Sequence, residues 1–134
     1  MKNIVFILII FFGAISILNA DVKKWKLEQV GFLNIDRNEK DYGGFSGLLI
    51  KNAGTEALVV TDKSFFFVLQ LRRDDNDFLT GYSVIKKGRI LSSKGEHLNG
   101  RNTDSESIAM DANNNYYISF ESNHRIMMHA EIEG

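Results

Sequence analysis

Short segments rich in β-branched and aromatic residues recur along the chain, and polar turns separate them. Residues of these types favour strands, whereas Gly, Asn and Asp favour turns. The predicted strands are residues 25–35, 45–51, 57–61, 65–71, 81–85, 108–111, 116–120 and 125–132. The predicted turns are residues 41–44, 52–55, 74–77, 86–88 and 111–115. No long helical pattern competes with these strands, so the sequence predicts an all-β fold of antiparallel meanders.

An internal repeat organises these strands. Residues 46–48 align with residues 106–108, and residues 57–62 align with residues 116–121. Each copy contains an apolar strand, a polar turn, a second apolar strand, an acidic residue and then a third strand. Repeated sheet units of this size are typical of β-propellers, whose blades have four strands each. The sequence therefore predicts antiparallel meander blades of an incomplete β-propeller, about one and a half to two of the four to eight blades that complete one.

Two explanations of the incomplete ring remain open. Either the sequence is a fragment of a longer protein, which we favour, or several copies associate to complete the ring. An open sheet leaves reactive edges, so a chain of this kind is expected to close its strands on one another or on a partner. The sequence does not determine the oligomeric state.

The N-terminus has the layout of a secretory signal peptide. Lys2 supplies a positive charge, residues 4–18 are almost wholly apolar, and the small Ala20 precedes a charged stretch. The apolar stretch is shorter than the roughly twenty residues that a spanning helix needs. We expect cleavage after Ala20 and a secreted or periplasmic protein, residues 21–134, without a membrane segment. The alternative is an uncleaved anchor, because Leu18 is bulky for its position before the cut.

Composition excludes several classes of function. The formal net charge is −1, which gives no general attraction for nucleic acid or an anionic membrane. The absence of Cys excludes a disulfide framework and a thiolate metal site. His97, His124 and His129 are scattered without a short ligand spacing, so a zinc site is not expected. The fold must therefore be stabilised by packing alone.

The repeat predicts where polar side chains gather. Ser46 and Glu106 occupy equivalent positions before a strand, while Asp62 and Glu121 each follow one. Asp104 lies two residues before Glu106, so both carboxylates face one side of an extended segment. Carboxylate oxygens suit Ca²⁺ or another divalent cation, which could polarise an ester and activate water. The predicted catalytic and metal-binding acids are Asp62, Asp104, Glu106 and Glu121.

Three further side chains complete the candidate site. Lys63 and Arg125 are expected to hold an anionic substrate or to stabilise developing negative charge, with Ser46 beside them. The alternative interpretation is that these acids are solvated or cap turns, and that the two cations only pair with them. The acidic turn at residues 74–77 has a calcium-loop composition, but it lacks the glycine and distal Glu of an EF-hand. We interpret it as a hairpin turn.

Four ordered segments resemble the phytase-like domain family, also described as the esterase-like activity of phytase. They are residues 43–48, residues 60–63, residues 104–109, and residues 119–126 with a gap after Glu121. The resemblance covers about residues 25–132, the first part of a complete family member. It implies a propeller domain in which Asp62, Asp104, Glu106 and Glu121 serve ester or phosphoester hydrolysis, accompanied by Lys63 and Arg125. Ser107 departs from the pattern, because many relatives have Gly there.

The resemblance implies an exported hydrolase that acts on a small-molecule phosphate ester or related ester, with activity in the full-length protein only. A non-catalytic propeller that binds a partner in the cell envelope is the alternative, because one fold hosts many functions. A calcium-dependent lactonase-like propeller is a third interpretation that differs only in its substrate.

Overall fold

The computed structural model describes residues 25–35 and 41–132. The expected signal peptide, residues 1–20, lies outside the described residues. In the described part of the chain, no helix is long and apolar enough to cross a membrane.

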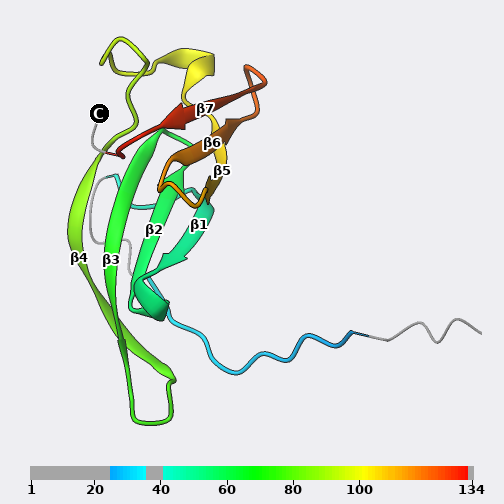
Figure 1. Ribbon diagram of the computed structural model, residues 1–134, viewed down its shortest axis with the longest axis vertical. Helices are drawn as coiled ribbons and strands as arrows, with labels where there is room; N and C mark the ends of the chain where they lie inside the picture. The colour runs from blue at the N-terminus through cyan, green and yellow to red at the C-terminus, as the bar shows by residue number, and fades with distance from the viewer. Residues whose placement is uncertain (1–24, 36–40, 133–134) are drawn as a thin grey trace, which may run out of the picture.

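Two antiparallel sheets make up the described structure, as the sequence predicts (Figure 1). The first sheet has the strand order β1-β2-β3-β4, and the second has the order β5-β6-β7. The first sheet contains β1 (Phe45–Lys51), β2 (Glu56–Thr61), β3 (Phe65–Arg73) and β4 (Leu79–Arg89), and the second contains β5 (Ser105–Met110), β6 (Tyr116–Phe120) and β7 (Arg125–His129). Two short 3-10 turns, η1 (Asn52–Gly54) and η2 (Gly100–Asn102), lie in the connections. Neither sheet closes into a ring within the described residues.

The expected strand at residues 25–35 is wrong. This segment carries strand-forming side chains, but it forms no ladder with the two sheets. Leu27, Val30 and Phe32 are 101%, 77% and 73% exposed. A strand needs a neighbouring edge to bond its N–H and C=O groups, and composition alone does not reveal whether such an edge is within reach.

The expected turn at residues 86–88 is also wrong, because these residues lie inside β4. Gly88 pairs with Phe66 across the ladder between β3 and β4. A Cβ atom on Gly88 would lie 2.6 Å from the Phe66 ring. The glycine therefore makes room for an aromatic ring rather than reversing the chain.

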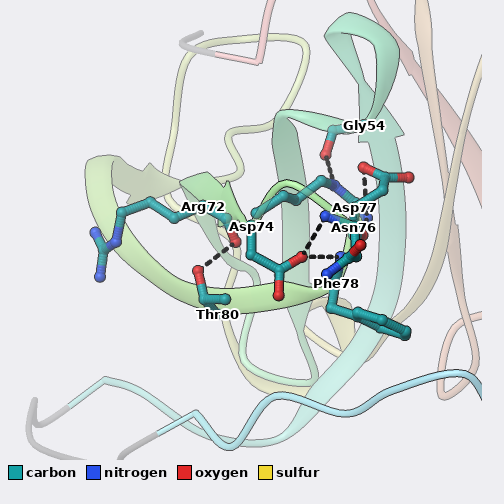
Figure 2. A network of polar contacts seen from close by, with 8 residues as sticks. Gly54, Arg72, Asp74, Asn76, Asp77, Phe78 and Thr80 are labelled. Carbon is teal, nitrogen blue, oxygen red and sulfur yellow. Dashed lines mark hydrogen bonds and ion pairs between the residues drawn. The ribbon is translucent and has the colours of Figure 1, made fainter.

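The acidic turn between β3 and β4 is a hairpin turn, as predicted (Figure 2). One carboxylate oxygen of Asp74 accepts hydrogen bonds from the backbone N–H groups of Asn76 and Phe78, both at 3.0 Å. Arg73 supports the turn from the side, because its guanidinium donates to the carbonyl oxygen of Asp77 at 2.8 Å. The Asp74 side chain thus replaces a backbone acceptor and fixes the reversal.

The main core lies between the two sheets. It joins buried side chains of the first sheet, including Leu58 and Val60, to Ile118 and its neighbours in the second. In the repeat alignment Val60 corresponds to Ser119, whereas Ile118 corresponds to Val59 on the opposite face of β2. The face of the first unit that lies in this contact is therefore not equivalent to the face that the second unit contributes. The two units pack front to back, each with the same orientation, rather than as mirror images.

Two serine hydroxyls link the two sheets where β1 meets β5, and one glycine allows the sheets to approach closely there. Ser105 is fully buried and its hydroxyl donates to the carbonyl of Thr61, while the hydroxyl of Ser46 donates to the carbonyl of Ser105. At Gly47, a Cβ atom would lie 2.9 Å from the Cα of Ser107. The close approach of the sheets depends on the absence of a side chain at Gly47.

Candidate functional site

A β-bulge opens the first strand of each repeat unit at the same position. The register between β1 and β2 shifts between Phe45 and Gly47, so Ser46 is the extra residue. The register between β5 and β6 shifts between Ser105 and Ser107, so Glu106 is the extra residue. Bulges turn a side chain away from the regular alternation of a strand and are common beside active sites. The sequence repeat is therefore also a structural repeat, with the candidate residues at its irregular positions.

The strand ends around each bulge are fixed by matching backbone hydrogen bonds. The N–H of Asp62 donates to the carbonyl of Gly44 at 2.9 Å. In the second unit, the N–H of Glu121 donates to the carbonyl of Asp104 at the same distance of 2.9 Å. These bonds hold the acid after the second strand beside the residue that precedes the bulge. In the second unit this bond brings Glu121 beside Asp104, although the two acids are far apart in the sequence.

Three of the four predicted acids form a compact cluster. Asp104, Glu106 and Glu121 each offer a carboxylate oxygen, and these oxygens all lie within 4.8 Å of one another. Asp104 and Glu106 are partly buried and Glu121 is exposed. Oxygen ligands at this spacing suit a hard divalent cation such as Ca²⁺. Asp62 comes from the first unit and lies close enough for its charge to act on Glu106.

Glu106 is the electrostatic centre of this cluster. Desolvation by its surroundings raises the pKa of Glu106 above its ordinary value, and the negative charges of Glu121, Asp104 and Asp62 raise it further. A hydrogen bond with Glu121 acts in the same direction. Like charges at short range disfavour the ionised form, whereas a bound cation would favour it. When these carboxylates are all ionised, the cluster therefore carries an excess of negative charge.

Two residues that the sequence analysis did not select position these acids. Ser122 donates its hydroxyl hydrogen bond to one carboxylate oxygen of Asp104. Gly44 has a φ of +64°, and a Cβ atom there would lie 2.2 Å from a carboxylate oxygen of Asp62. Only glycine combines this backbone angle with that close approach. Ser122 directly follows a predicted acid, which is a weak signal. The sequence places the Gly43-Gly44 pair in a turn and in a family segment, but it does not predict the contact with Asp62.

Ser46 faces the junction between the sheets. Its hydroxyl contacts the carbonyl oxygens of Ser105, at 2.5 Å, and of Val60, at 3.4 Å. The side chain that occupies the equivalent position in the second unit is Glu106, which belongs to the acidic cluster. The same bulge therefore supports a structural hydroxyl in one unit and a carboxylate in the other.

The two predicted cations occupy different environments. Lys63 is exposed in the turn after β2. The Arg125 guanidinium lies 3.9 Å from the centre of the Phe120 ring and donates to the carbonyls of Asn102 and Asn123 at 2.6 Å and 3.0 Å. Desolvation lowers the pKa of Arg125 from its ordinary value. Among the described residues, no ion pair links either cation to the four acids.

Comparison with protein-family models matches residues 40–132 to the model named Phytase-like, described as esterase-like activity of phytase. No curated protein and no solved structure matches the chain. The matched segment contains both sheets and all seven candidate residues.

Proposed function

Because the chain belongs to the phytase-like family, we propose that it is part of an exported hydrolase of phosphate esters or related esters. The acidic cluster carries this proposal, since three carboxylates of the second repeat unit converge there and the charge of Asp62, from the first unit, acts on Glu106. The front-to-back packing of the two units supports a propeller-like array, in which every added unit presents the same strand ends to one site. Export is proposed from the apolar segment at residues 4–18 and the small residue Ala20.

The residues present fit a divalent cation. Asp104, Glu106 and Glu121 would hold it, because their carboxylate oxygens lie within 4.8 Å of one another. Desolvation and then the neighbouring carboxylates raise the pKa of Glu106, and a cation would neutralise the negative charge of those carboxylates. When bound, Ca²⁺ or another divalent cation would supply Lewis acidity toward the ester oxygen.

The chain's own side chains then have separate roles. Asp104 is oriented by the Ser122 hydroxyl and keeps its carboxylate directed at the cluster. Glu106, at the centre of the cluster, would be a ligand of the cation, whose positive charge would favour the ionised form of this carboxylate. Lys63 is the cation with an exposed ammonium group, and it would bind the anionic part of the substrate. The Arg125 guanidinium already donates to two carbonyls, so its first role is to hold the loops beside β7.

The first experiment measures divalent-ion binding by isothermal titration calorimetry, with Ca²⁺ and Mg²⁺ titrated into the wild-type protein and into Glu106→Gln. The control is Asp75→Asn, which removes an exposed acid from the turn between β3 and β4. We expect binding by the wild type and by the control, and at least tenfold weaker binding by Glu106→Gln. No binding by the wild type at millimolar Ca²⁺ or Mg²⁺ would contradict the proposed cation site.

The second experiment measures hydrolysis by the full-length protein. The substrates are p-nitrophenyl phosphate, p-nitrophenyl acetate and a simple lactone, each assayed with Ca²⁺ and with a chelator. We expect cation-dependent release of p-nitrophenol that is lost in Glu106→Gln and retained in Asp75→Asn. Binding of the cation without turnover of any substrate would instead support the alternative of a non-catalytic envelope protein, and turnover of the lactone alone would reassign the substrate class.

A further inference from the structure

Ser122 links an arginine to the acidic cluster. Its hydroxyl donates a hydrogen bond to Asp104, and its backbone carbonyl accepts one from the Nη2 atom of Arg101 at 2.9 Å. Ser122 directly follows Glu121, which is another member of the cluster. The guanidinium of Arg101 is therefore held beside the carboxylates, although the sequence analysis did not select this residue.

The turn that carries Arg101 is fixed to the neighbouring loop. Arg101 lies in η2, which is drawn in yellow in Figure 1 at the same end of the second sheet as the turn between β6 and β7. The carbonyl of Asn102 accepts a hydrogen bond from Arg125 at 2.6 Å, and its side-chain oxygen accepts one from Asn123 at 2.8 Å. Because both the backbone and the guanidinium are held by hydrogen bonds, Arg101 is pre-organised, which lowers the entropic cost of binding a ligand.

The Arg101 guanidinium has donors available for an anion. The side chain is exposed, its bond to the Ser122 carbonyl uses only one of its several N–H donors, and it forms no ion pair among the described residues. The planar guanidinium matches the paired oxygens of a phosphate group. Arg125 has less capacity, because it already donates to two carbonyls and lies over the Phe120 ring.

The repeat places one exposed cation in each unit. Its register aligns Lys63 with Ser122 and, counted back from the bulge, Asp41 with Arg101. The first unit therefore carries its cation directly after Asp62, whereas the second unit carries it in η2. In the described part of the chain neither cation is engaged in an ion pair.

The charge balance of the cluster calls for such cations. Three carboxylates gather there, and the charge of Asp62 also acts on Glu106. The charge of one divalent cation does not neutralise all of these acids when they are ionised, so an anionic substrate would still be repelled. A guanidinium beside the cluster offsets this repulsion for the part of the substrate that approaches Arg101.

We propose that Arg101 binds the anionic oxygens of the substrate and thereby makes the site select anionic esters over neutral ones. This inference rests on the proposed function, because it takes the acidic cluster as the hydrolytic site. Lewis acidity at the cluster does not by itself distinguish an anionic ester from a neutral one. A guanidinium does, because its charge-assisted hydrogen bonds to a phosphate group are stronger than its bonds to a neutral carbonyl.

The first test measures the binding of phenylphosphonate, an anion that is not hydrolysed, to the full-length protein by isothermal titration calorimetry, with and without Ca²⁺. We expect Arg101→Gln to weaken this binding at least about tenfold, and Arg101→Lys to weaken it less, because lysine keeps the charge without the planar fork. The affinity for Ca²⁺ should change less than about threefold. The control is Arg72→Gln, which removes the same charge from an exposed side chain near the far end of β3 and should change phenylphosphonate binding less than about twofold.

Other outcomes of this test decide against the proposal or against the cation site. Equal binding of phenylphosphonate by the wild type and Arg101→Gln would overturn the proposal, as would no binding by the wild type in either condition. An equal loss of Ca²⁺ affinity in Arg101→Gln would show that Arg101 only positions Asp104 through Ser122, and would also overturn it. If the wild type binds phenylphosphonate but not Ca²⁺, and Arg101→Gln loses the anion, the cation site fails and the role of Arg101 stands.

The second test measures selectivity in hydrolysis by the full-length protein with Ca²⁺. We expect Arg101→Gln to lower kcat/KM at least about tenfold for p-nitrophenyl phosphate and less than about threefold for p-nitrophenyl acetate, because only the first substrate is anionic. A loss of equal size on both substrates would refute selection by charge. Inactivity of the wild type toward both substrates would contradict the hydrolase function, and the phenylphosphonate measurement would then decide the role of Arg101 on its own.

Discussion

Replacing Gly47 by alanine tests the junction of the two sheets. An added Cβ would lie 2.7 Å from a methyl carbon of Val60, 2.9 Å from the Cα of Ser107 and 3.0 Å from the backbone nitrogen of Ile108. Two of these three atoms belong to the backbone of the other sheet, so they cannot move aside without separating β1 from β5.

The magnitude follows from these contacts. Overpacking of a well-packed site costs about 1–3 kcal/mol, and the rigid backbone neighbours place this substitution in the upper half of that range. Replacing glycine restricts the unfolded chain and returns about 0.4–1 kcal/mol. We therefore expect a net loss of about 1–2 kcal/mol in the free energy of unfolding, or roughly 5–15 °C in melting temperature for a domain of this size.

Thermal unfolding followed by circular dichroism measures this loss. The matched control is Gly81→Ala in β4, where an added Cβ would lie 2.6 Å from the end of the Arg72 side chain. That side chain is flexible and can move, so the control should lose less than about 0.5 kcal/mol. The reasoning fails if Gly47→Ala is no less stable than Gly81→Ala, because the sheets would then not be in rigid contact at this point.

Two further predictions concern pH. The pKa of Glu106 is raised in the folded state, so the folded protein loses stability as pH rises through that pKa. Glu106→Gln should therefore be more stable than the wild type at pH 7, with a flatter dependence of melting temperature on pH above the ordinary range of a carboxyl pKa. The pKa of Asp111 is lowered, chiefly by a hydrogen bond from the side chain of Asn115, so its contribution is present above the unfolded value and is lost as pH falls through the folded one. Asp111→Asn should be less stable than the wild type at pH 7 and should lose less stability below about pH 4. Melting curves recorded at a series of pH values measure both effects. Equal acid sensitivity of the two proteins would contradict this role of Asp111.

The strands were predictable where the side chains alternate and the turn residues are specific. The bounds of β1 and β6 agree with the prediction, because both lie between turns rich in glycine or asparagine. The strand β4 extends from Leu79 to Arg89, beyond the expected residues 81–85, because its pairing with β3 decides its length rather than its own composition. Pairing also explains the error at residues 25–35, where a strand-like composition forms no ladder among the described residues.

Part of the candidate site was predictable from the internal repeat and from the spacing of acids along the chain. Glu106 and Glu121 were predictable because they align with Ser46 and Asp62, and Asp104 because it lies two residues before Glu106. The contact of Ser122 with Asp104 and the close approach of Gly44 to Asp62 depend on details of the bulge that no spacing in the sequence encodes. The position of Arg125 over Phe120 likewise follows from a loop whose path the sequence does not specify.

The front-to-back contact of the two units has an evolutionary consequence. Two unlike faces that fit each other allow a unit to be duplicated in the gene without a new interface, since the copy already carries both faces. Each duplicated unit also brings its own bulge, and hence one side chain near the shared end of the sheets. Ser46 and Glu106 occupy this position in the two units. The chemistry of the site can therefore diverge by a point mutation in one unit while the scaffold of every unit stays the same.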